Sequence, residues 1–414
     1  MTANGKSLRV SSLPLSGNEK QRRSKRKRFF IRLAALFFWR SSACPAPCLR
    51  LRRKGDGKEE LNQNILDQID KLDTEELQKY IDSLGVFSDK NVGERIFDYI
   101  KGEKFDYGSF GQQILNVLFE DVKNMLPAFA CICAVALLCG ILSSVKSSFA
   151  DQTSADVIFL VGYAAALIPV LAVLTECFSR AWASVASMQK QMQLVFPILM
   201  TLMAASGGSV SAAIYQPAVA FLSTSIVSIV SSVVLPLTLT IIAFSMAGNL
   251  SGELKLNNFS SFFKSINKWI IGACVSVFGL FFTVQGLTAA TYDGITRRAA
   301  KYAIGTGVPI VGGFLSGGFD LAVAGSVLIK NSLGSLSIFL MVSVLFEPLV
   351  LLMAANLFLR LTAAVTQPLG ESRISNFLGE TADNLNYCTA GLLFVAFLYF
   401  IGIVLVICSS EVIF

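Results

Sequence analysis

Eight apolar segments, most of them close to the length that crosses a bilayer, constrain this chain more than any other feature. A helix needs about 20 mainly apolar residues to span the hydrocarbon core of roughly 30 Å. Hydrophobic residues make up 53% of the 414 residues and charged residues 15%, whereas soluble domains carry roughly 25% charged residues. We predict an all-α polytopic membrane protein with about seven or eight membrane-embedded segments. These segments lie near 126–145, 157–178, 194–214, 217–247, 269–290, 308–329, 335–358 and 387–408.

Two stretches framed by prolines, Pro197–Pro236 and Pro309–Pro348, suggest an internal repeat. Both open with Pro-Ile, both contain Ser-Gly-Gly, and in both the closing proline is followed by Leu-x-Leu. Chance similarity between apolar segments is the alternative, because such segments draw on few residue types. A unit of three spans would turn its second copy upside down. The pattern therefore predicts an inverted repeat, whose broken helices meet at a site near the bilayer midplane.

The candidate site residues lie in these two stretches and are helix-breaking, small or ionisable. Ionisable groups are costly in lipid and usually face protein or water, so mutual pairing and a role in transport both stay open for them. Glycines allow either broken helices or close packing, and we expect broken helices at the two Ser-Gly-Gly positions. The broken-helix, pore or packing candidates are Pro197, Ser206, Gly207, Gly208, Pro309, Gly312, Gly313, Ser316, Gly317, Gly318, Asp320, Lys330, Glu347 and Pro348.

The composition argues against most catalytic chemistry. The chain contains no histidine, which removes the commonest general base and a common metal ligand. Seven of the nine cysteines lie in or beside apolar segments, where cysteine behaves as a small apolar residue. Histidine-based triads and zinc sites with histidine ligands are therefore excluded, and no disulfide framework is indicated; we name no catalytic, cofactor-binding or metal-binding residue.

The charge is unevenly distributed and divides the chain into regions. Residues 1–57 form a basic extension with a short apolar, signal-peptide-like segment. Its basic run could instead bind anionic lipid, and we do not expect nucleic acid as a partner. Residues 58–124 show helical apolar spacing, and we predict an amphipathic helical region outside the cytoplasm. Two transmembrane helices at 125–190 and two repeat units at 191–303 and 304–414 follow.

Two further expectations concern the polar segments between the spans. The polar stretches 248–268 and 361–386 mix aromatic, aliphatic and charged residues, which suits helices lying along the membrane interface. The basic cluster Arg297, Arg298 and Lys301 predicts that residues 291–303 are cytoplasmic.

Several runs of sequence carry a resemblance to a known family. They are KLDTEELQKYIDSLG, YQPAVAFLSTSI, the stretch from FSSFFKSINKW to GGFLSGGFD, SVLIKNSLG and AAVTQPLGESRISNFL. These runs resemble stage III sporulation protein AE of endospore-forming Firmicutes, over about residues 60–408. The basic extension, with Cys44 and Cys48, departs from the simple signal peptide of that family.

The resemblance implies a non-enzymatic, multi-pass subunit in the mother-cell-derived outer forespore membrane. It would work with the other stage III sporulation A-operon proteins, and indirectly with stage II sporulation protein Q, in a channel or secretion-like complex. That complex supports late forespore gene expression after engulfment. A small-solute permease with a midplane site between the repeats is the alternative, and a homo-oligomer in the lipid bilayer is left open.

Overall fold

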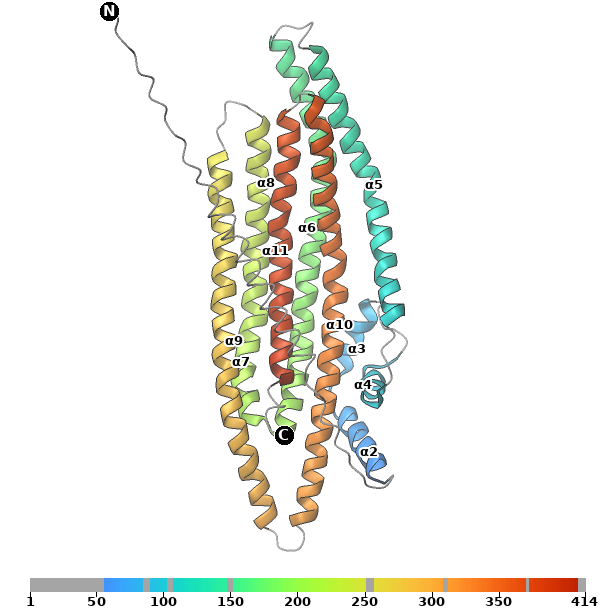
Figure 1. Cartoon of the computed structure of the whole chain (residues 1–414), viewed down its shortest axis with the longest axis vertical. Coiled ribbons are helices and arrows are strands. Elements are labelled where there is room, and N and C mark those ends of the chain that lie inside the picture. Colours follow the sequence, from blue (N-terminus) through green and yellow to red (C-terminus); the bar gives the residue numbers. More distant parts are fainter. Residues whose placement is uncertain are drawn as a thin grey trace, which may run out of the picture. The chain divides into compact units, whose positions relative to one another are not determined.

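The computed structural model describes residues 56–84, 90–102, 107–146, 152–250, 257–307, 312–369 and 372–408 (Figure 1). The basic extension, its signal-peptide-like segment and Pro309 lie outside these residues. Contacts separate Met1–Gly57 from Lys58–Phe414, and the packing below concerns the latter unit.

Every described range is helical apart from short turns and contains no strand, which confirms the all-α prediction. Three short helices, α2 (Asp56–Asp70), α3 (Glu75–Leu84) and α4 (Val92–Lys101), come first. Long helices follow: α5 (Tyr107–Lys146), α6 (Gln152–Ala205), α7 (Ser209–Ile229), α8 (Leu235–Leu250), α9 (Asn257–Gly307), α10 (Gly312–Thr366) and α11 (Ser372–Cys408). A π-helical turn at Val230–Val234 joins α7 to α8, and a 3-10 turn at Gln367–Leu369 follows α10.

The described residues contain six helical stretches that are long and apolar enough to cross a membrane. The predicted segments 157–178 and 194–214 fall largely within one continuous helix, α6, and 335–358 shares α10 with the described part of 308–329. The polar residues between them do not break the helix, since alanine, methionine, glutamine and lysine favour helix. At 1.5 Å per residue the 54 residues of α6 extend about 80 Å. This length exceeds twice the hydrocarbon core.

The two stretches predicted to lie along the membrane interface are ends of long helices instead. Residues 248–250 finish α8 and 257–268 begin α9, while 361–366 finish α10 and 372–386 begin α11. That prediction is wrong, because the amphipathic residues continue directly into the apolar part of the same helix.

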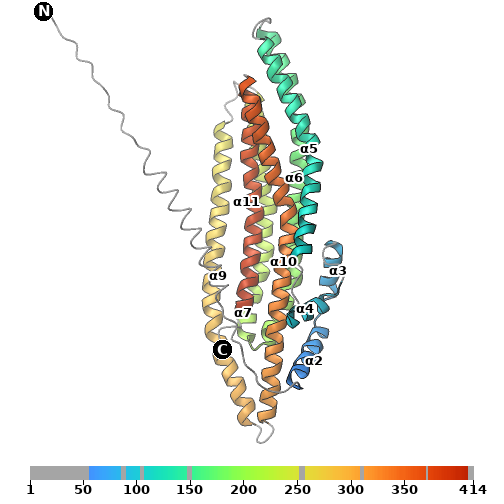
Figure 2. The same ribbon diagram turned by 45° about the vertical axis from the view of Figure 1, so that its right-hand side comes forward.

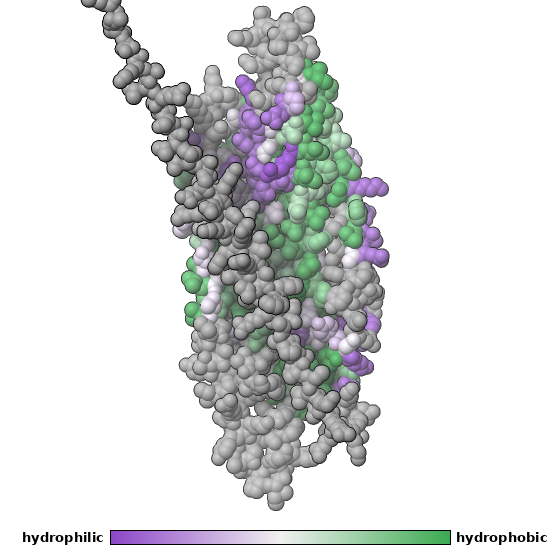
Figure 3. Space-filling view, viewed as in Figure 1, coloured by the Kyte–Doolittle hydropathy of each residue, from purple (hydrophilic) through white to green (hydrophobic). Residues whose placement is uncertain are grey.

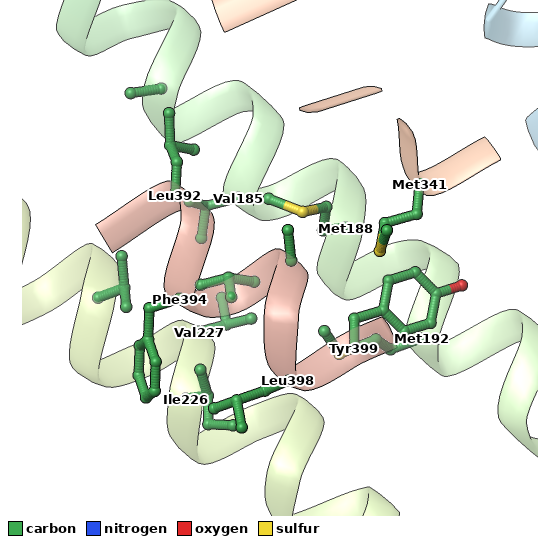
Figure 4. Close-up of a cluster of buried hydrophobic side chains, with 14 of the residues drawn as sticks. Val185, Met188, Met192, Ile226, Val227, Met341, Leu392, Phe394, Leu398 and Tyr399 are labelled. Atoms are coloured by element: carbon green, nitrogen blue, oxygen red, sulfur yellow. The ribbon is translucent and has the colours of Figure 1, made fainter. Parts of the chain in front are cut away.

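Helix α11 lies in the interior of the bundle and contacts α6, α7, α8, α9 and α10. Figure 4 shows its side chains Leu392 and Leu398 among methionines and valines of α6, α7 and α10. Close approach is required here: a Cβ on Gly334 of α10 would lie 2.5 Å from Cδ1 of Ile407. Lipid tails are as apolar as these side chains, so tight packing stabilises such helix pairs.

Hydrogen bonds and an ion pair between helices fix the relative directions of α6, α7–α8 and α10. The Ser184 hydroxyl of α6 donates to the carbonyl of Val344 in α10 at 3.0 Å, with Arg180 paired to Glu347 one turn away. Along the same helix, Trp182 donates to the carbonyl of Ser231 and Tyr163 to that of Met246. Both α10 and the α7–α8 pair therefore run opposite to α6, and so run in the same sense as each other.

This shared direction overturns the inverted repeat. After their Ser-Gly-Gly positions, the stretches up to Pro236 and Pro348 run along α7–α8 and α10. Inverted copies would run in opposite senses across the bilayer. The equal proline spacing does not reflect a pseudo-twofold axis in the membrane plane, and the prediction of such an axis is wrong.

The predicted amphipathic helices form and pack against the long ones, as Figure 2 shows for α2–α4 beside α10. Their inward positions are buried as expected at Ile65, Ile69, Leu77, Ile81, Val92 and Ile96. Polar contacts complete the packing. The Gln68 side chain of α2 donates to the carbonyl of Ala322 at 3.2 Å and accepts from Ser326 at 2.9 Å. On α3, burial raises the pKa of Tyr80, so its hydroxyl stays protonated and donates to the carbonyl of Ser187.

These contacts place the polar helix α2 near one end of the bundle. Only four residues separate the end of α9 from the start of α10, and Ala322 lies ten residues into α10. Ten helical residues cover about 15 Å. The polar helix α2, whose Gln68 bonds to Ala322, and residues 291–303 at the end of α9 therefore lie at the same end of the bundle. The prediction had placed them on opposite sides of the membrane, whereas a bilayer perpendicular to the helices would leave both on one side.

Candidate functional site

The first Ser-Gly-Gly position breaks the helix as predicted, between α6 and α7. Gly207 has φ +90°, a left-handed conformation that glycine adopts at low cost. Its N–H donates to the carbonyl of Ala204 at 3.1 Å, and the N–H of Gly208 donates to that of Met203 at 2.9 Å. This is the Schellman arrangement that satisfies the last carbonyls of a helix. The buried Ser206 hydroxyl also donates to Met203.

The second Ser-Gly-Gly position does not break the helix. Ser316, Gly317 and Gly318 lie within continuous α10, which begins at Gly312 and Gly313. Glycine inside a helix costs about 1 kcal/mol relative to alanine, and a long apolar helix tolerates that cost. The prediction of a second broken helix is therefore wrong. Pro197 and Pro348 likewise lie inside helices, α6 and α10.

Lys330 has a structural partner at the end of α11. Its side chain is fully buried, and its ammonium donates to the carbonyls of Val406 at 3.0 Å and Ile407 at 2.9 Å. The last carbonyls of a helix lack intrahelical partners and carry partial negative charge. Lys330 of α10 therefore caps α11, whose final residue is Cys408.

Glu347 belongs to an ion-pair cluster on the outside of α6 and α10. Arg180 pairs with Glu347 and, at 2.7 Å, with Glu176 one turn earlier in its own helix. The side chains are 43%, 37% and 51% exposed, respectively. These charges therefore compensate one another while remaining open to their surroundings.

The two charged site residues whose side chains are described, Lys330 and Glu347, do not meet in one place. Lys330 and Glu347 lie 17 residues apart along α10, which is about 25 Å. Asp320 lies ten residues before Lys330 in the same helix, and its side chain is outside the described set. Lys330 instead joins α10 to α11, and Glu347 joins α10 to α6.

A polar region that the sequence interpretation missed lies in the first half of α11. Figure 3 shows hydrophilic residues gathered in the upper part of one face, beside a hydrophobic band. We call a set of polar residues on α11 the α11 polar layer; its members Thr381 and Asn384 are fully buried and so are not part of that surface. The layer comprises Glu380, Thr381, Asp383, Asn384, Asn386 and Tyr387.

The carboxylates of the α11 polar layer connect α11 to its neighbours. Glu380 accepts hydrogen bonds from Ser245 and, at 3.3 Å, from Asn249 of α8. Asp383 pairs with Arg360 of α10, which also donates to Asn356 at 2.9 Å. Charge-assisted hydrogen bonds of this kind are stronger than neutral ones.

Amide side chains link this region to α10, and a separate hydrogen bond joins α9 to α8. Asn356 donates to the carbonyl of Ala382 and to Asn386. Asn267 of α9 donates to the hydroxyl of Thr238 of α8 at 3.0 Å. Polar residues of α8, α9 and α10 thus surround the first half of α11.

Some buried groups of the α11 polar layer have no hydrogen-bond partner within the described part of the chain. They are the hydroxyl of Thr381 and both polar atoms of the Asn384 side chain, and both residues are fully buried. Such groups could bond to a further polar group that enters the bundle. The polar residues at 380–386 can be recognised in the sequence. They were interpreted as part of a helix along the membrane interface, so the buried polar region was not predicted.

The described residues offer little for a metal ion. Among them, no group of three or more histidine, cysteine, aspartate or glutamate side chains could hold one. The cysteines within the described ranges are free thiols.

Comparison with known proteins identifies the family of the chain. Residues 91–410 match the family model described as stage III sporulation protein AE. The stage III sporulation protein AE of Bacillus subtilis (strain 168) is 24% identical over 317 residues, covering 76% of this chain and 79% of that protein. No solved structure matches the chain.

Proposed function

Because the chain belongs to the stage III sporulation protein AE family, we propose that it is a membrane subunit of a channel or secretion-like complex connecting mother cell and forespore. It is a sporulation protein, and its apolar helices make it a membrane protein. The complex supports late forespore gene expression after engulfment. The membrane is the mother-cell-derived outer forespore membrane. Its partners are the other stage III sporulation A-operon proteins and, indirectly, stage II sporulation protein Q.

One observation supports a subunit over a permease: the described polar groups hold helices together. Lys330 joins α10 to α11, Glu347 joins α10 to α6, and Glu380 joins α11 to α8. A solute path needs groups that converge on a common space. The permease alternative also depended on the inverted repeat, which the helix directions exclude.

The first experiment tests membership in the complex. A tagged chain, purified from sporulating cells of its own host, should retain the A-operon proteins. Deletion of its gene should abolish a late forespore reporter, and the unchanged gene supplied in trans should restore it. Normal reporter output in the deletion strain, or purification without those partners, would contradict the proposal.

The second experiment separates scaffold from solute path at Asp320. In a scaffold, Asp320→Asn should leave both reporter output and co-purification close to those of the unchanged chain. A variant that assembles normally but loses the reporter would instead place Asp320 on the path of a solute. Asp82→Asn, at an exposed position of α3, is the matched control.

A further inference from the structure

Two fully buried polar side chains inside the bundle have no hydrogen-bond partner within the described helices. They are Gln191 of α6, whose amide nitrogen and oxygen are both unpaired, and Tyr399 of α11, whose hydroxyl is unpaired. Neither residue belongs to the α11 polar layer or to the ion pairs described above. Nearly all buried polar groups in folded proteins bond to protein or to ordered water. Each of these two side chains therefore needs a partner that the described helices do not supply.

The Tyr399 side chain is polar only at its tip. Its ring packs edge to face against Phe196 of α6, with the ring centroids 5.6 Å apart. Figure 4 shows the ring beside Met192, with the hydroxyl directed away from Leu392 and Phe394. A buried tyrosine hydroxyl usually finds a hydrogen-bond partner. Because the surroundings of the ring are apolar, that partner must lie on the side to which the hydroxyl points.

A second tyrosine, Tyr80 of the polar helix α3, reaches the same place. Its side chain is 3% exposed, and its hydroxyl donates to the carbonyl of Ser187 at 3.2 Å. Tyr80 also interacts electrostatically with Tyr399. Ser187 and Gln191 are one turn apart on α6 and so face the same side of that helix. We call the three side chains that meet here, Tyr80, Gln191 and Tyr399, the polar junction.

The groups of the polar junction are close together but not all in direct contact. Burial raises the pKa of Tyr80, and the Gln191 amide opposes this rise, which places the amide near the Tyr80 hydroxyl. Gln191 nonetheless makes no hydrogen bond to any group in the described part of the chain. Polar groups that influence one another across more than a hydrogen-bond length are commonly bridged by water.

The chemistry of the polar junction selects the kind of molecule that can bind there. The Gln191 side chain has N–H donors and a carbonyl acceptor, and each tyrosine hydroxyl can both donate and accept. All three groups are neutral, so an ion of either sign would lose its hydration without meeting an opposite charge among them. The occupant is small, because α3 and α11 both pack against α6. Lys190, next to Gln191 in the chain, is exposed, so bulk water lies one residue away.

We propose that the polar junction binds a water molecule that bridges α3, α6 and α11. The water donates to the Tyr80 oxygen, whose own proton points to Ser187, and to the carbonyl of Gln191. It accepts a hydrogen bond from the Tyr399 hydroxyl. Three hydrogen bonds are the usual number for a buried water. The bound water joins the polar helix α3 to the interior of the membrane bundle, and this role does not depend on the proposed function.

A structure of the full chain in nanodiscs, at a resolution that shows ordered water, tests the site directly. A density peak is expected within about 3.2 Å of the Tyr80 oxygen, the Gln191 amide and the Tyr399 oxygen. Direct hydrogen bonds among the three side chains, with no peak between them, would overturn the proposal. This measurement uses the unsubstituted chain, so it decides the question even if a variant fails to fold.

Thermal unfolding in detergent micelles gives a test in which the two outcomes have opposite signs. If water is bound, Tyr399→Phe removes one of its hydrogen bonds and should lower the Tm by about 1–3 °C. If the hydroxyl has no partner, its removal from apolar surroundings should raise the Tm or leave it unchanged. That second result would contradict the proposal. Tyr99→Phe on α4, where the side chain is 39% exposed, is the matched control and should leave the Tm unchanged.

Combining two substitutions tests whether the groups share one molecule. Gln191→Leu and Tyr399→Phe together should lower the Tm by less than the sum of their separate effects, because either change already weakens the binding of the water. Strictly additive losses would show that the two side chains bond to different partners, and the bridging water would then be excluded.

Discussion

The stretches Pro197–Pro236 and Pro309–Pro348 share a sequence frame but not a structure. In the first, Ser-Gly-Gly ends α6 with a left-handed glycine and reverses the chain. In the second, the same three residues lie within α10, which continues to Thr366. The difference teaches that a pair of glycines permits a helix end without requiring one. Whether the helix ends there depends on the residues that follow. In the first stretch they form α7, which runs antiparallel to α6, and in the second they continue α10.

The charges in the two stretches differ as well. Lys330 in the second stretch caps α11, whereas the position 112 residues earlier is Ala218, which is buried. Corresponding positions of the two stretches therefore carry different residues and contact different parts of the bundle. The following experiments test this contrast, in order of the size of their expected effects.

Labelling from outside the cell tests the direction of the two stretches and should give an all-or-none result. In a cysteine-free background, Ser83→Cys and Thr296→Cys should react alike with an impermeant maleimide on intact cells, because α2–α4 and the end of α9 lie on one side. Lys146→Cys, at the other end of α5, should show the opposite pattern. Opposite labelling at Ser83→Cys and Thr296→Cys would contradict the helix directions described above.

Removal of the buried cation should have the largest effect on stability. Lys330→Met keeps much of the side-chain volume but leaves two carbonyls of α11 without their partner. Hydrogen bonds to charged groups contribute about 1.5–3 kcal/mol, so we expect a loss of about 3 kcal/mol in the free energy of unfolding. Unfolding by denaturant in detergent micelles measures it, with the exposed Lys79→Met as control. A change as small as that of the control would show that the ammonium does not cap α11.

The same substitution in the two Ser-Gly-Gly positions should act in opposite directions. Gly207→Ala places a Cβ on a residue with φ +90°, which costs about 1–2 kcal/mol. Gly317→Ala lies inside a helix, where alanine is favoured by up to about 1 kcal/mol. Thermal unfolding of both variants under identical conditions gives the comparison. Equal destabilisation by both would mean that the second position also requires glycine.

The exposed ion pair of the second stretch should contribute least. Arg180→Met removes the partner of Glu176 and Glu347, but these side chains are open to their surroundings. Exposed pairs contribute about 1 kcal/mol or less, and we expect a change in that range. A double-mutant cycle with Glu347→Gln isolates the pair. A coupling energy well above this range would show that the cluster is shielded by lipid or by a partner.

Local patterns in the sequence were sufficient for much of the fold. The long apolar segments determined an all-α membrane protein, because a bilayer requires about 20 apolar residues per crossing. Helical spacing also identified the buried positions of α2–α4, such as Ile65 and Leu77. The helix end at Gly207 was predictable, since only glycine enters the left-handed region freely.

Tertiary structure alone decided which groups meet. The cap that Lys330 forms on α11, the Arg180–Glu347 pair and the contacts of Glu380 with α8 all join residues far apart in the chain. Hydropathy and periodicity describe one helix at a time, and they carry no information on the direction or register of its neighbours. The sequence did not distinguish the continuous α10 at Gly317 from the helix end at Gly207, because both positions carry the same Ser-Gly-Gly. The charged residues of the second stretch could be identified from the sequence. Only the tertiary structure showed that Lys330 contacts α11 and Glu347 contacts α6.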